Sequence, residues 1–314
     1  MPIPNDRSSL PEIVLRQECN YIAVFLTMAC PYRCSYCINE HESPRKKEDI
    51  LPGSEWVRGL SRLTNLERQE GAVPVTLQGG EPSVHPDFYE IINGLPERIP
   101  IDLLTNLSFD VERFIARVDP ARLKRQAPYA SIRVSYHPGQ VAFEELLVKT
   151  HRLMEAGFSI GIYGVLHPDQ QEHILAMQQR AVREGVDFRT KEFLGFARGR
   201  LYGQYKYEDA CTLSHTRQVR CRTSELLIGA GGNVYRCHHD LYEQGEPIGH
   251  ILDPGFEMMN EPRPCRWYGH CNPCDIKVKT NRLQQFGYTA VDIEFPATAG
   301  GRRKSRRAVA AATG

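Results

Sequence analysis

The sequence predicts an α/β fold, an open partial barrel of parallel strands followed by a small cysteine-rich domain. Up to Gly195, short β-rich runs alternate with longer stretches in which apolar residues recur at helical spacing. Beyond Gly195 this alternation stops, and five cysteines follow between Cys221 and Cys274. The chain of 314 residues is long enough for one large core with a smaller appendage.

Six β-rich runs are the predicted strands of the barrel. They are residues 21–28, 74–78, 101–105, 131–136, 159–166 and 188–194. Between them, apolar residues at helical spacing predict crossover helices, with Ser54 and Asp110 as helix N-caps. Six βα units are too few for a closed eight-stranded TIM barrel, so we expect a partial (βα)6 barrel. Its functional loops should follow the carboxyl ends of the strands.

The predicted organisation has four parts. Residues 1–20 form an N-terminal extension, 21–200 the barrel, 201–285 the cysteine-rich region and 286–314 a disordered tail. The tail carries a basic run, Arg302 to Arg307, which could contact nucleic acid but is better interpreted as solvated. The cysteine-rich region is short for an independent core, so bound metal is expected to help hold it.

Charge and hydropathy limit the classes of partner. The 39 Lys and Arg nearly balance the 38 Asp and Glu, so no global field favours nucleic acid or an anionic membrane. No apolar stretch approaches the roughly 18 residues of a membrane span, and the start lacks a signal peptide pattern. We therefore expect a cytoplasmic protein. In a reducing compartment, the ten cysteines indicate metal binding rather than disulfides.

The first cysteine group follows the first predicted strand directly. Cys30, Cys34 and Cys37 form a C-x3-C-x2-C arrangement on a loop. Structural zinc and saturated clusters normally take four protein ligands, whereas three thiolates leave one iron of a 4Fe-4S cluster open to a small molecule. A zinc site is the alternative interpretation.

This arrangement after a first strand resembles the signature of the radical S-adenosylmethionine (SAM) superfamily. At the end of the second predicted strand, Gly79, Gly80 and Glu81 precede Pro82, which is similar to the GGEP motif of that family. The resemblance implies that this segment receives the amino group of the methionine moiety. An ordinary turn is the alternative, because glycine supplies positive φ there.

The resemblance extends to weaker elements. It implies that the backbone of Tyr36 approaches the adenine, that Asn106, in a Thr-Asn element, binds SAM, and that Ser135 lies near the ribose of SAM. A strand-terminal Asn or Ser that only caps or turns the chain is the alternative. The glycines between Gly157 and Gly164 resemble the family's adenine-side strand, which close packing alone would also explain.

The second cysteine group resembles the auxiliary-cluster domains of the SPASM and Twitch subgroups. Cys221 and Cys237 flank Gly232 in a C-x10-G-x4-C spacing, in which residues 226–228 and 234–235 are predicted to form a hairpin. A full SPASM pattern has seven cysteines, so five indicate the shorter Twitch form with one auxiliary 4Fe-4S cluster. The resemblance implies four ligands for it, namely Cys221, Cys237, Cys271 and Cys274.

Several assignments in this region stay open. Cys265 is left over as an alternative ligand, a thiol near the substrate or a spectator, and a zinc ribbon is the alternative for the whole set. Cys19 and Cys211 are interpreted as buried inert thiols. Beside the second group, His238, His239 and Asp240 could transfer protons or form an ordinary polar strand end.

The resemblance also implies a mechanism. An electron from the cluster, supplied by a flavodoxin or ferredoxin, splits SAM, and the resulting 5'-deoxyadenosyl radical abstracts hydrogen from the substrate. Substrate contacts are expected near strand ends, where His137, Lys191 and Glu192 lie, and Cys265 is a further candidate.

Three functions are compatible with these motifs. The first is a biosynthetic enzyme acting on a small molecule such as a sugar, aminoglycoside or nucleoside. The second is a maturase of a ribosomally made peptide, which the roughly twenty residues before the first strand disfavour, since peptide maturases often carry an N-terminal leader-binding module. The third is a non-catalytic iron-sulfur or zinc scaffold, in which Gly79 to Glu81 would have no role.

Overall fold

The computed structural model describes residues 10–40, 50–69, 71–259, 261–279 and 288–296. Its main sheet has nine strands in the order β14-β13-β12-β2-β4-β5-β6-β7-β8. Six consecutive members run parallel, and each corresponds to a predicted barrel strand. They are β2 (Tyr21–Thr27), β4 (Val75–Gly79), β5 (Ile101–Thr105), β6 (Ile132–Tyr136), β7 (Ile160–Leu166) and β8 (Phe188–Glu192). The predicted parallel α/β architecture is confirmed.

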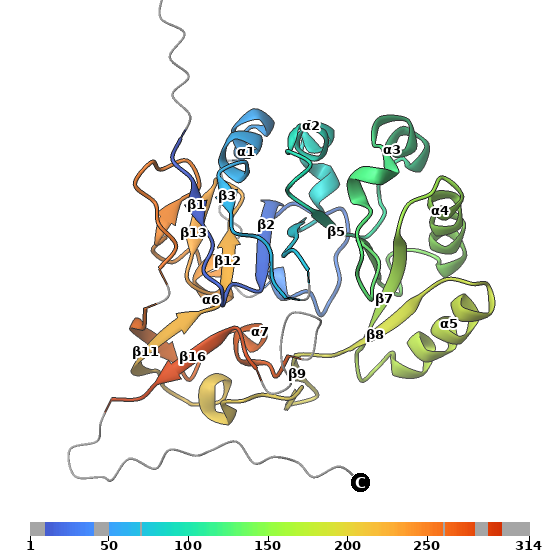
Figure 1. The fold of residues 1–314 in the computed structure, drawn as a ribbon. Helices are drawn as coiled ribbons and strands as arrows, with labels where there is room; N and C mark the ends of the chain where they lie inside the picture. Colours follow the sequence, from blue (N-terminus) through green and yellow to red (C-terminus); the bar gives the residue numbers. More distant parts are fainter. Residues whose placement is uncertain (1–9, 41–49, 70, 260, 280–287, 297–314) are drawn as a thin grey trace, which may run out of the picture.

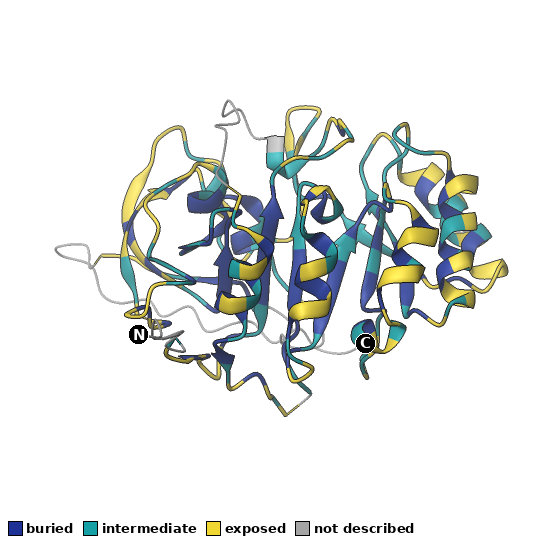
Figure 2. Ribbon diagram, turned by 90° about the horizontal axis from the view of Figure 1, so that it is seen from above, coloured by how far each residue is buried: buried dark blue, intermediate teal, exposed yellow. Residues whose placement is uncertain are grey.

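Five helices cover one face of this sheet (Figures 1 and 2). They are α1 (Gly53–Leu60), α2 (Phe88–Gly94), α3 (Val111–Arg117), α4 (Phe143–Glu155) and α5 (Gln171–Arg183). Each buries an apolar stripe against the strands, for example Leu146, Leu147 and Leu153 of α4. Short connecting elements complete this part: β1 (Ile13–Val14), β3 (Leu63–Thr64), η1 (Ile38–Glu40), η2 (Pro82–Val84) and η3 (Pro120–Leu123).

One of the two predicted helix caps is confirmed. The Asp110 carboxylate accepts a hydrogen bond from the backbone N–H of Arg113 at the start of α3. The Ser54 prediction is wrong, because α1 already begins at Gly53, after Pro52. The backbone N–H of Gly53 donates instead to Oδ2 of Asp87, at 2.8 Å, so a residue distant in sequence supplies the acceptor.

The cysteine-rich region is not a separate unit. Its predicted hairpin forms, with β12 (Glu225–Ile228) antiparallel to β13 (Asn233–Tyr235), but β12 also pairs in parallel with β2. The hairpin and β14 (Gly249–His250) therefore extend the barrel sheet, and the predicted boundary at residue 201 separates segments that share one sheet. Hydrophobic periodicity does not reveal the pairing of β12 with β2, because these strands lie about 200 residues apart in the sequence.

A second, three-stranded sheet has the order β15-β11-β16. It consists of β15 (Arg263–Tyr268), β11 (Arg217–Thr223) and β16 (Val291–Glu294). Strand β16 lies within the range predicted as a tail, so that prediction is wrong for residues 291–294, which pair with β11. The remaining basic run, Arg302 to Arg307, lies outside the described residues. Other elements are β9 (Gly195–Ala197), β10 (Arg200–Tyr202), η4 (Glu208–Cys211), α6 (His238–Tyr242) and α7 (Pro273–Ile276).

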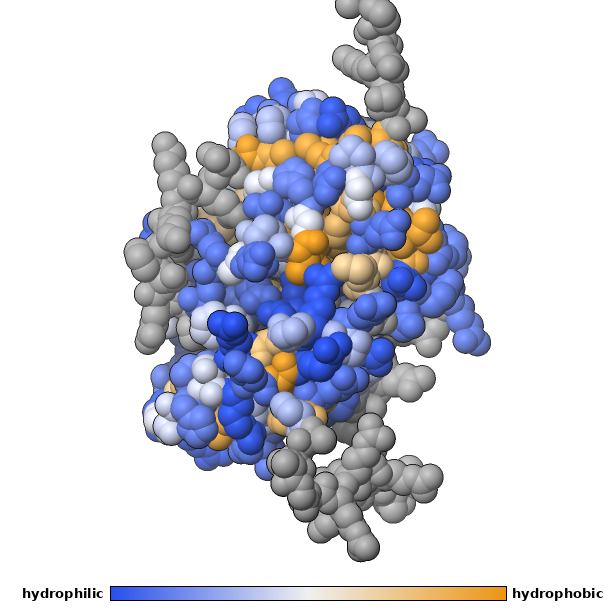
Figure 3. Space-filling view, turned by 90° about the vertical axis from the view of Figure 1, so that its left-hand side faces the viewer, coloured by the Kyte–Doolittle hydropathy of each residue, from blue (hydrophilic) through white to orange (hydrophobic). Residues whose placement is uncertain are grey.

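The described residues form three hydrophobic clusters. The largest fills the space between the barrel strands and helices α1 to α5, with Trp56 and Phe114 fully buried. A second lies in the cysteine-rich region and includes Cys221, Cys237 and Cys265. A third includes Phe25 of β2 and Leu227 of β12. The side of the molecule that carries β11 and β13 is mostly hydrophilic, with several smaller hydrophobic groups (Figure 3). Among the described residues, no helix combines the length and apolar character that a membrane span requires.

Candidate functional site

The cysteine loop, residues 28–37, follows the carboxyl end of β2 and contacts residues that follow the neighbouring strands β5 and β6. The Asn106 side-chain amide, just after β5, lies 3.5 Å from Sγ of Cys30 and donates to it. The backbone N–H of Arg33 donates to Oε1 of Gln140 at 2.7 Å, in the loop after β6. These contacts fix the loop from two sides, at the edge of the sheet where the sequence predicts chemistry.

Gly79 packs on the end of β2, and Gly80 packs directly on this loop. A Cβ atom on Gly79 would lie 2.1 Å from the carbonyl oxygen of Thr27, and one on Gly80 would lie 2.3 Å from that of Ala29. Gly79 also has a φ of 144°. Both contacts are with backbone, which cannot move aside cheaply, so only glycine fits at either position. The two glycines are therefore required by the close approach of β4 to the cysteine loop.

The carboxylate of Glu81, which follows β4, connects the end of that strand to the end of β5. It accepts hydrogen bonds from the hydroxyls of Ser83 (2.6 Å) and Thr105 (2.8 Å) and from the backbone N–H of Asn106 (2.7 Å). Burial raises the pKa of Glu81, and these hydrogen bonds oppose that effect. Glu81 therefore holds Asn106 in the position from which its amide reaches Cys30. Motif reasoning expected this carboxylate only at the ligand and missed its role inside the fold.

An aromatic group lies beside the cysteine loop. The Tyr36 hydroxyl lies 3.1 Å from Nδ1 of His137, and its ring stacks on His167 with centroids 5.3 Å apart. Burial lowers the pKa of His137 to about 4, so its imidazole is neutral at physiological pH. His137 directly follows β6, as predicted. His167 was missed, although its position directly after β7 was the available signal.

Other predicted residues lie on the strands β6 and β8. Ser135 on β6 is partly buried and faces Tyr163 of β7 in register. Lys191 and Glu192 end β8, near the carboxyl edge of the sheet as predicted. The ammonium of Lys191 lies over the Tyr163 ring, 4.9 Å from its centroid. Lys191 therefore packs against β7 through the ring of Tyr163.

The sequence analysis did not indicate one buried carboxylate, which lies near the start of β5. Asp102 near the start of β5 binds the guanidinium of Arg125 at 2.6 Å and that of Arg133 at 3.1 Å. Its side chain is fully buried, so both arginines are held in fixed positions. Sequence reasoning missed Asp102 because it lies inside an apolar strand.

The cysteine-rich region brings five thiols to one core, and a sixth, Cys274, lies in α7. Cys221, Cys237 and Cys265 are buried there, whereas Cys211, Cys271 and Cys274 are partly buried. A hydrogen bond between the neighbouring thiols lowers the pKa of Cys265 and raises that of Cys221. Cys211, interpreted from the sequence as a buried inert thiol, is only partly buried and lies against the same core, because η4 packs against β15. Cys19 is fully buried, as predicted, and burial raises its pKa to about 12.

The thiols at both sites suit iron-sulfur clusters by chemistry, since thiolates are the usual ligands of these clusters. At the first site, the amide of Asn106 already donates to Cys30, as an outer hydrogen bond to a cluster ligand does. Within the part of the chain that the structure describes, no three His, Cys, Asp or Glu side chains are arranged to hold a single metal ion.

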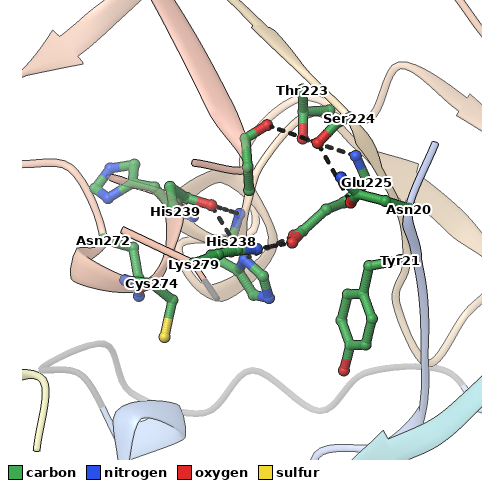
Figure 4. Close-up of polar contacts among 12 residues, drawn as sticks. Asn20, Tyr21, Thr223, Ser224, Glu225, His238, His239, Asn272, Cys274 and Lys279 are labelled. Carbon is green, nitrogen blue, oxygen red and sulfur yellow. Dashed lines mark hydrogen bonds and ion pairs between the residues drawn. The ribbon is translucent and has the colours of Figure 1, made fainter. Parts of the chain in front are cut away.

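A buried polar network ties the second cysteine group to the barrel (Figure 4). Glu225 on β12 binds the ammonium of Lys279, and Nδ1 of His238 lies 3.0 Å from the Asp275 carboxylate. Asp275 also accepts the backbone N–H of His238, at 3.0 Å. Burial lowers the pKa of His238, but the hydrogen bond and charge of Asp275 outweigh it and raise the value. Since His238 and Asp275 directly follow Cys237 and Cys274, the network fixes the turns that carry these thiols.

Two curated proteins show what the chain is similar to in sequence. The chain is 24% identical to a GTP 3',8-cyclase from Yersinia pestis over 257 residues, covering 77% of this chain and 65% of the relative. It is 33% identical to molybdenum cofactor biosynthesis protein 1 of Mus musculus over 108 residues, covering 33% of this chain and 16% of the relative. The chain thus spans less than two thirds of the length of these relatives.

Solved structures share the fold. A polyhistidine-tagged form of anSMEcpe with bound AdoMet superposes with a TM-score of 0.51 at 13% identity, covering 77% of this chain and 78% of the other. Native anSMEcpe with bound AdoMet and a peptide gives a TM-score of 0.50 at the same identity and the same coverage. The family model of the radical SAM superfamily matches residues 24–180, which contain the cysteine loop and the barrel strands β4 to β7. The chain belongs to the radical SAM superfamily and is an enzyme of that class.

Proposed function

We propose that Cys30, Cys34 and Cys37 hold a 4Fe-4S cluster whose open iron binds SAM, and that the enzyme abstracts hydrogen from a small-molecule substrate. The observation that carries this proposal is the loop itself, which is fixed against two glycines that admit no side chain and against Asn106. When bound, the cluster supplies the electron that splits SAM into methionine and a 5'-deoxyadenosyl radical. A flavodoxin or ferredoxin is the proposed electron donor, in the cytoplasm.

The residues around the loop have separate proposed tasks. The backbone of Gly79 to Glu81 receives the methionine amino group, while the backbone of Tyr36, with Asn106 and Ser135, binds the nucleoside part. The ring of Tyr36 already contacts those of His137 and His167, so this group of rings needs little ordering on binding. Because burial keeps His137 neutral, it can exchange hydrogen bonds without adding charge beside the cluster.

The proposed substrate class is a nucleotide or nucleoside. Among sugars, aminoglycosides and nucleosides, the nucleosides are favoured by relatives named as GTP 3',8-cyclases. Lys191 near the end of β8 adds a positive charge over the Tyr163 ring, which suits a phosphorylated substrate. The solved structure with a bound peptide is 13% identical, shares the fold alone, and gives no support for a peptide substrate here.

The second cysteine group is proposed to hold an auxiliary 4Fe-4S cluster of the Twitch type. The proposed ligands are Cys221, Cys237, Cys271 and Cys274. The first three lie at the core of the cysteine-rich region with Cys265 and Cys211, and Cys274 lies in α7 near Cys211, which supports this set. If the substrate loses two electrons, the radical removes one with a hydrogen atom, and this cluster can accept the second. Cys265 is the first alternative ligand, because its hydrogen bond with Cys221 lowers its pKa and so favours the thiolate.

The experiment is an anaerobic assay of 5'-deoxyadenosine. Reconstituted, reduced protein is incubated with SAM and, in parallel, with GTP, guanosine, an aminoglycoside or a short peptide. We expect slow SAM cleavage alone and faster cleavage with the nucleotide or nucleoside. Stimulation by an aminoglycoside or peptide alone contradicts the substrate class, and protein with full iron content that never forms 5'-deoxyadenosine contradicts the proposed reaction.

A further inference from the structure

Helix α6 begins without a side-chain cap from its own N-cap residue. Cys237 holds that position and makes no capping hydrogen bond through its side chain. The first N–H groups of a helix have no partner within the helix, so they need an acceptor from elsewhere. Asp275 of α7 supplies it, because its carboxylate accepts from the backbone N–H of His238 at 3.0 Å and from that of His239 at 3.3 Å. A carboxylate from another helix thus caps the turn that carries the Cys237 thiol.

The start of α7 has a cap of its own, which leaves Asp275 available for α6. Oδ1 of Asn272 accepts from the backbone N–H of Cys274 at 2.9 Å. Asn272 and Asp275 are both buried, and Figure 4 shows Asn272 and Cys274 beside His238. Since Asp275 directly follows Cys274, one buried side chain joins the turns of two proposed ligands.

The imidazole of His238 adds a third contact to the same carboxylate. Its Nδ1 lies 3.0 Å from Oδ1 of Asp275 and 3.7 Å from the carboxylate of Glu225. The ring packs edge-on against Phe25 of β2, with centroids 6.3 Å apart, and against Tyr242, with centroids 5.8 Å apart. These neighbours hold the imidazole in place, so the barrel strand β2 also helps to orient Asp275.

We propose that Asp275 is a positioning residue for the auxiliary cluster, whose carboxylate sets the Cys237 turn against the Cys274 turn. This inference rests on the proposed function, since it takes Cys237 and Cys274 as ligands. Groups that hydrogen-bond around a metal site orient its ligands. Here the effect passes through the backbone of α6, so Asp275 needs no contact with the cluster itself. Without this acceptor, the Cys237 turn is free to shift and its bond to the cluster is weakened.

The test isolates the second cysteine group in the full-length chain. The parent protein has all three cysteines of the first group replaced by Ala, so any cluster that it binds belongs to the second group. Asp275→Ala removes the acceptor, whereas Asp275→Asn keeps Oδ1 as an acceptor. Asp240→Ala is the matched control, because it removes another buried carboxylate of this region, whose partner is Arg236 at 2.9 Å. Reconstituted proteins are compared by iron content, by electron paramagnetic resonance after reduction, and by the rate at which an iron chelator removes the cluster.

We expect the Asp275→Ala protein to fold, to show a changed spectrum, and to lose its cluster to the chelator about tenfold faster or more. The reason is that two backbone N–H groups and one imidazole lose a charged acceptor. Asp275→Asn and Asp240→Ala should keep the spectrum and the release rate of the parent protein. Circular dichroism checks the fold, and a purely structural role would not change the spectrum of folded protein.

Three results overturn the positioning role. They are an Asp275→Ala protein with the spectrum and release rate of the parent, an Asp275→Asn protein as damaged as Asp275→Ala, and an Asp240→Ala protein with the same losses. If Asp275→Ala does not fold, Asp275→Asn decides: the parent's spectrum supports the role of the acceptor, and a changed spectrum overturns it.

The metal content of the parent protein tests the proposed function separately. A parent that binds zinc in place of iron contradicts the auxiliary cluster, and the rate of zinc release from the same variants then tests Asp275. A parent that binds no metal overturns both the cluster and the positioning role. A parent with about four irons, together with an Asp275→Ala protein that behaves like it, leaves the cluster standing and removes only the role of Asp275.

Discussion

The two cysteine groups are held in different ways. Backbone fixes the first: β4 approaches so closely that Gly79 and Gly80 admit no side chain, and the loop is short and contiguous. Side chains hold the second: its thiols come from η4, two strands and the starts of two short helices, and the buried network around Glu225 and Asp275 supports their turns. We therefore expect the loop of the first site to stay folded when its cluster is lost. The folding of the second site depends more on bound metal and on paired buried charges.

The largest expected effect is on the first group. The triple substitution of Cys30, Cys34 and Cys37 by Ala should abolish 5'-deoxyadenosine formation, because the auxiliary cluster is proposed to be saturated by four thiolates. Reconstituted wild type should hold about eight irons and the variant about four. Iron analysis and the anaerobic assay check both expectations. An intact protein with near four irons and bound zinc contradicts the auxiliary assignment.

The next effect separates cleavage from product formation. Cys271→Ala or Cys274→Ala should leave SAM cleavage measurable while abolishing product, because the second electron then has no acceptor. A metal-dependent segment can unfold when a ligand is lost, so circular dichroism and iron analysis must accompany the assay. Cys19→Ala is the matched control, since that buried thiol lies in the barrel core. A folded variant that forms the normal product at the normal rate shows that the auxiliary cluster is structural.

A smaller effect tests the backbone contact. Gly80→Ala places a Cβ atom 2.3 Å from the Ala29 carbonyl oxygen, so the cysteine loop must shift. We expect a loss of about 1 to 3 kcal/mol in unfolding free energy and weaker retention of the first cluster. Gly255→Ala, whose Cβ would meet nothing closer than 3.5 Å, is the control. If both variants have the same unfolding midpoint and iron content, close packing does not fix the loop.

The smallest effect concerns Glu81. In Glu81→Ala, the Thr105 hydroxyl and the Asn106 N–H lose their acceptor, at a cost of about 1 to 3 kcal/mol. The iron content should stay nearly unchanged while SAM affinity falls, because Asn106 is no longer fixed. Exposed Glu172 on α5, substituted by Ala, serves as the control. If the Glu81 variant binds SAM as tightly as the wild type does, the segment from Gly79 to Pro82 is an ordinary turn with no role in SAM binding.

The sequence predicted the local features of this protein well. Hydrophobic runs located all six barrel strands, and the spacing of Cys221, Gly232 and Cys237 located the hairpin, because both signals are short-range. Long-range pairings were not predictable from period or motif. The parallel pairing of β12 with β2, the Asp87 acceptor at α1 and the position of Cys211 all depend on residues distant in sequence. Likewise, the internal partners of Glu81 at the end of β5 lie about 25 residues away.

Electron paramagnetic resonance with and without SAM tests most directly whether the two cysteine groups hold two clusters of which one is open. The reduced triple variant of Cys30, Cys34 and Cys37 is compared with reduced Cys271→Ala protein. SAM should change the spectrum of the Cys271→Ala protein, whose remaining cluster has an open iron, and should leave the spectrum of the triple variant unchanged. A SAM-dependent change in the triple variant, with none in the Cys271→Ala protein, would contradict the account.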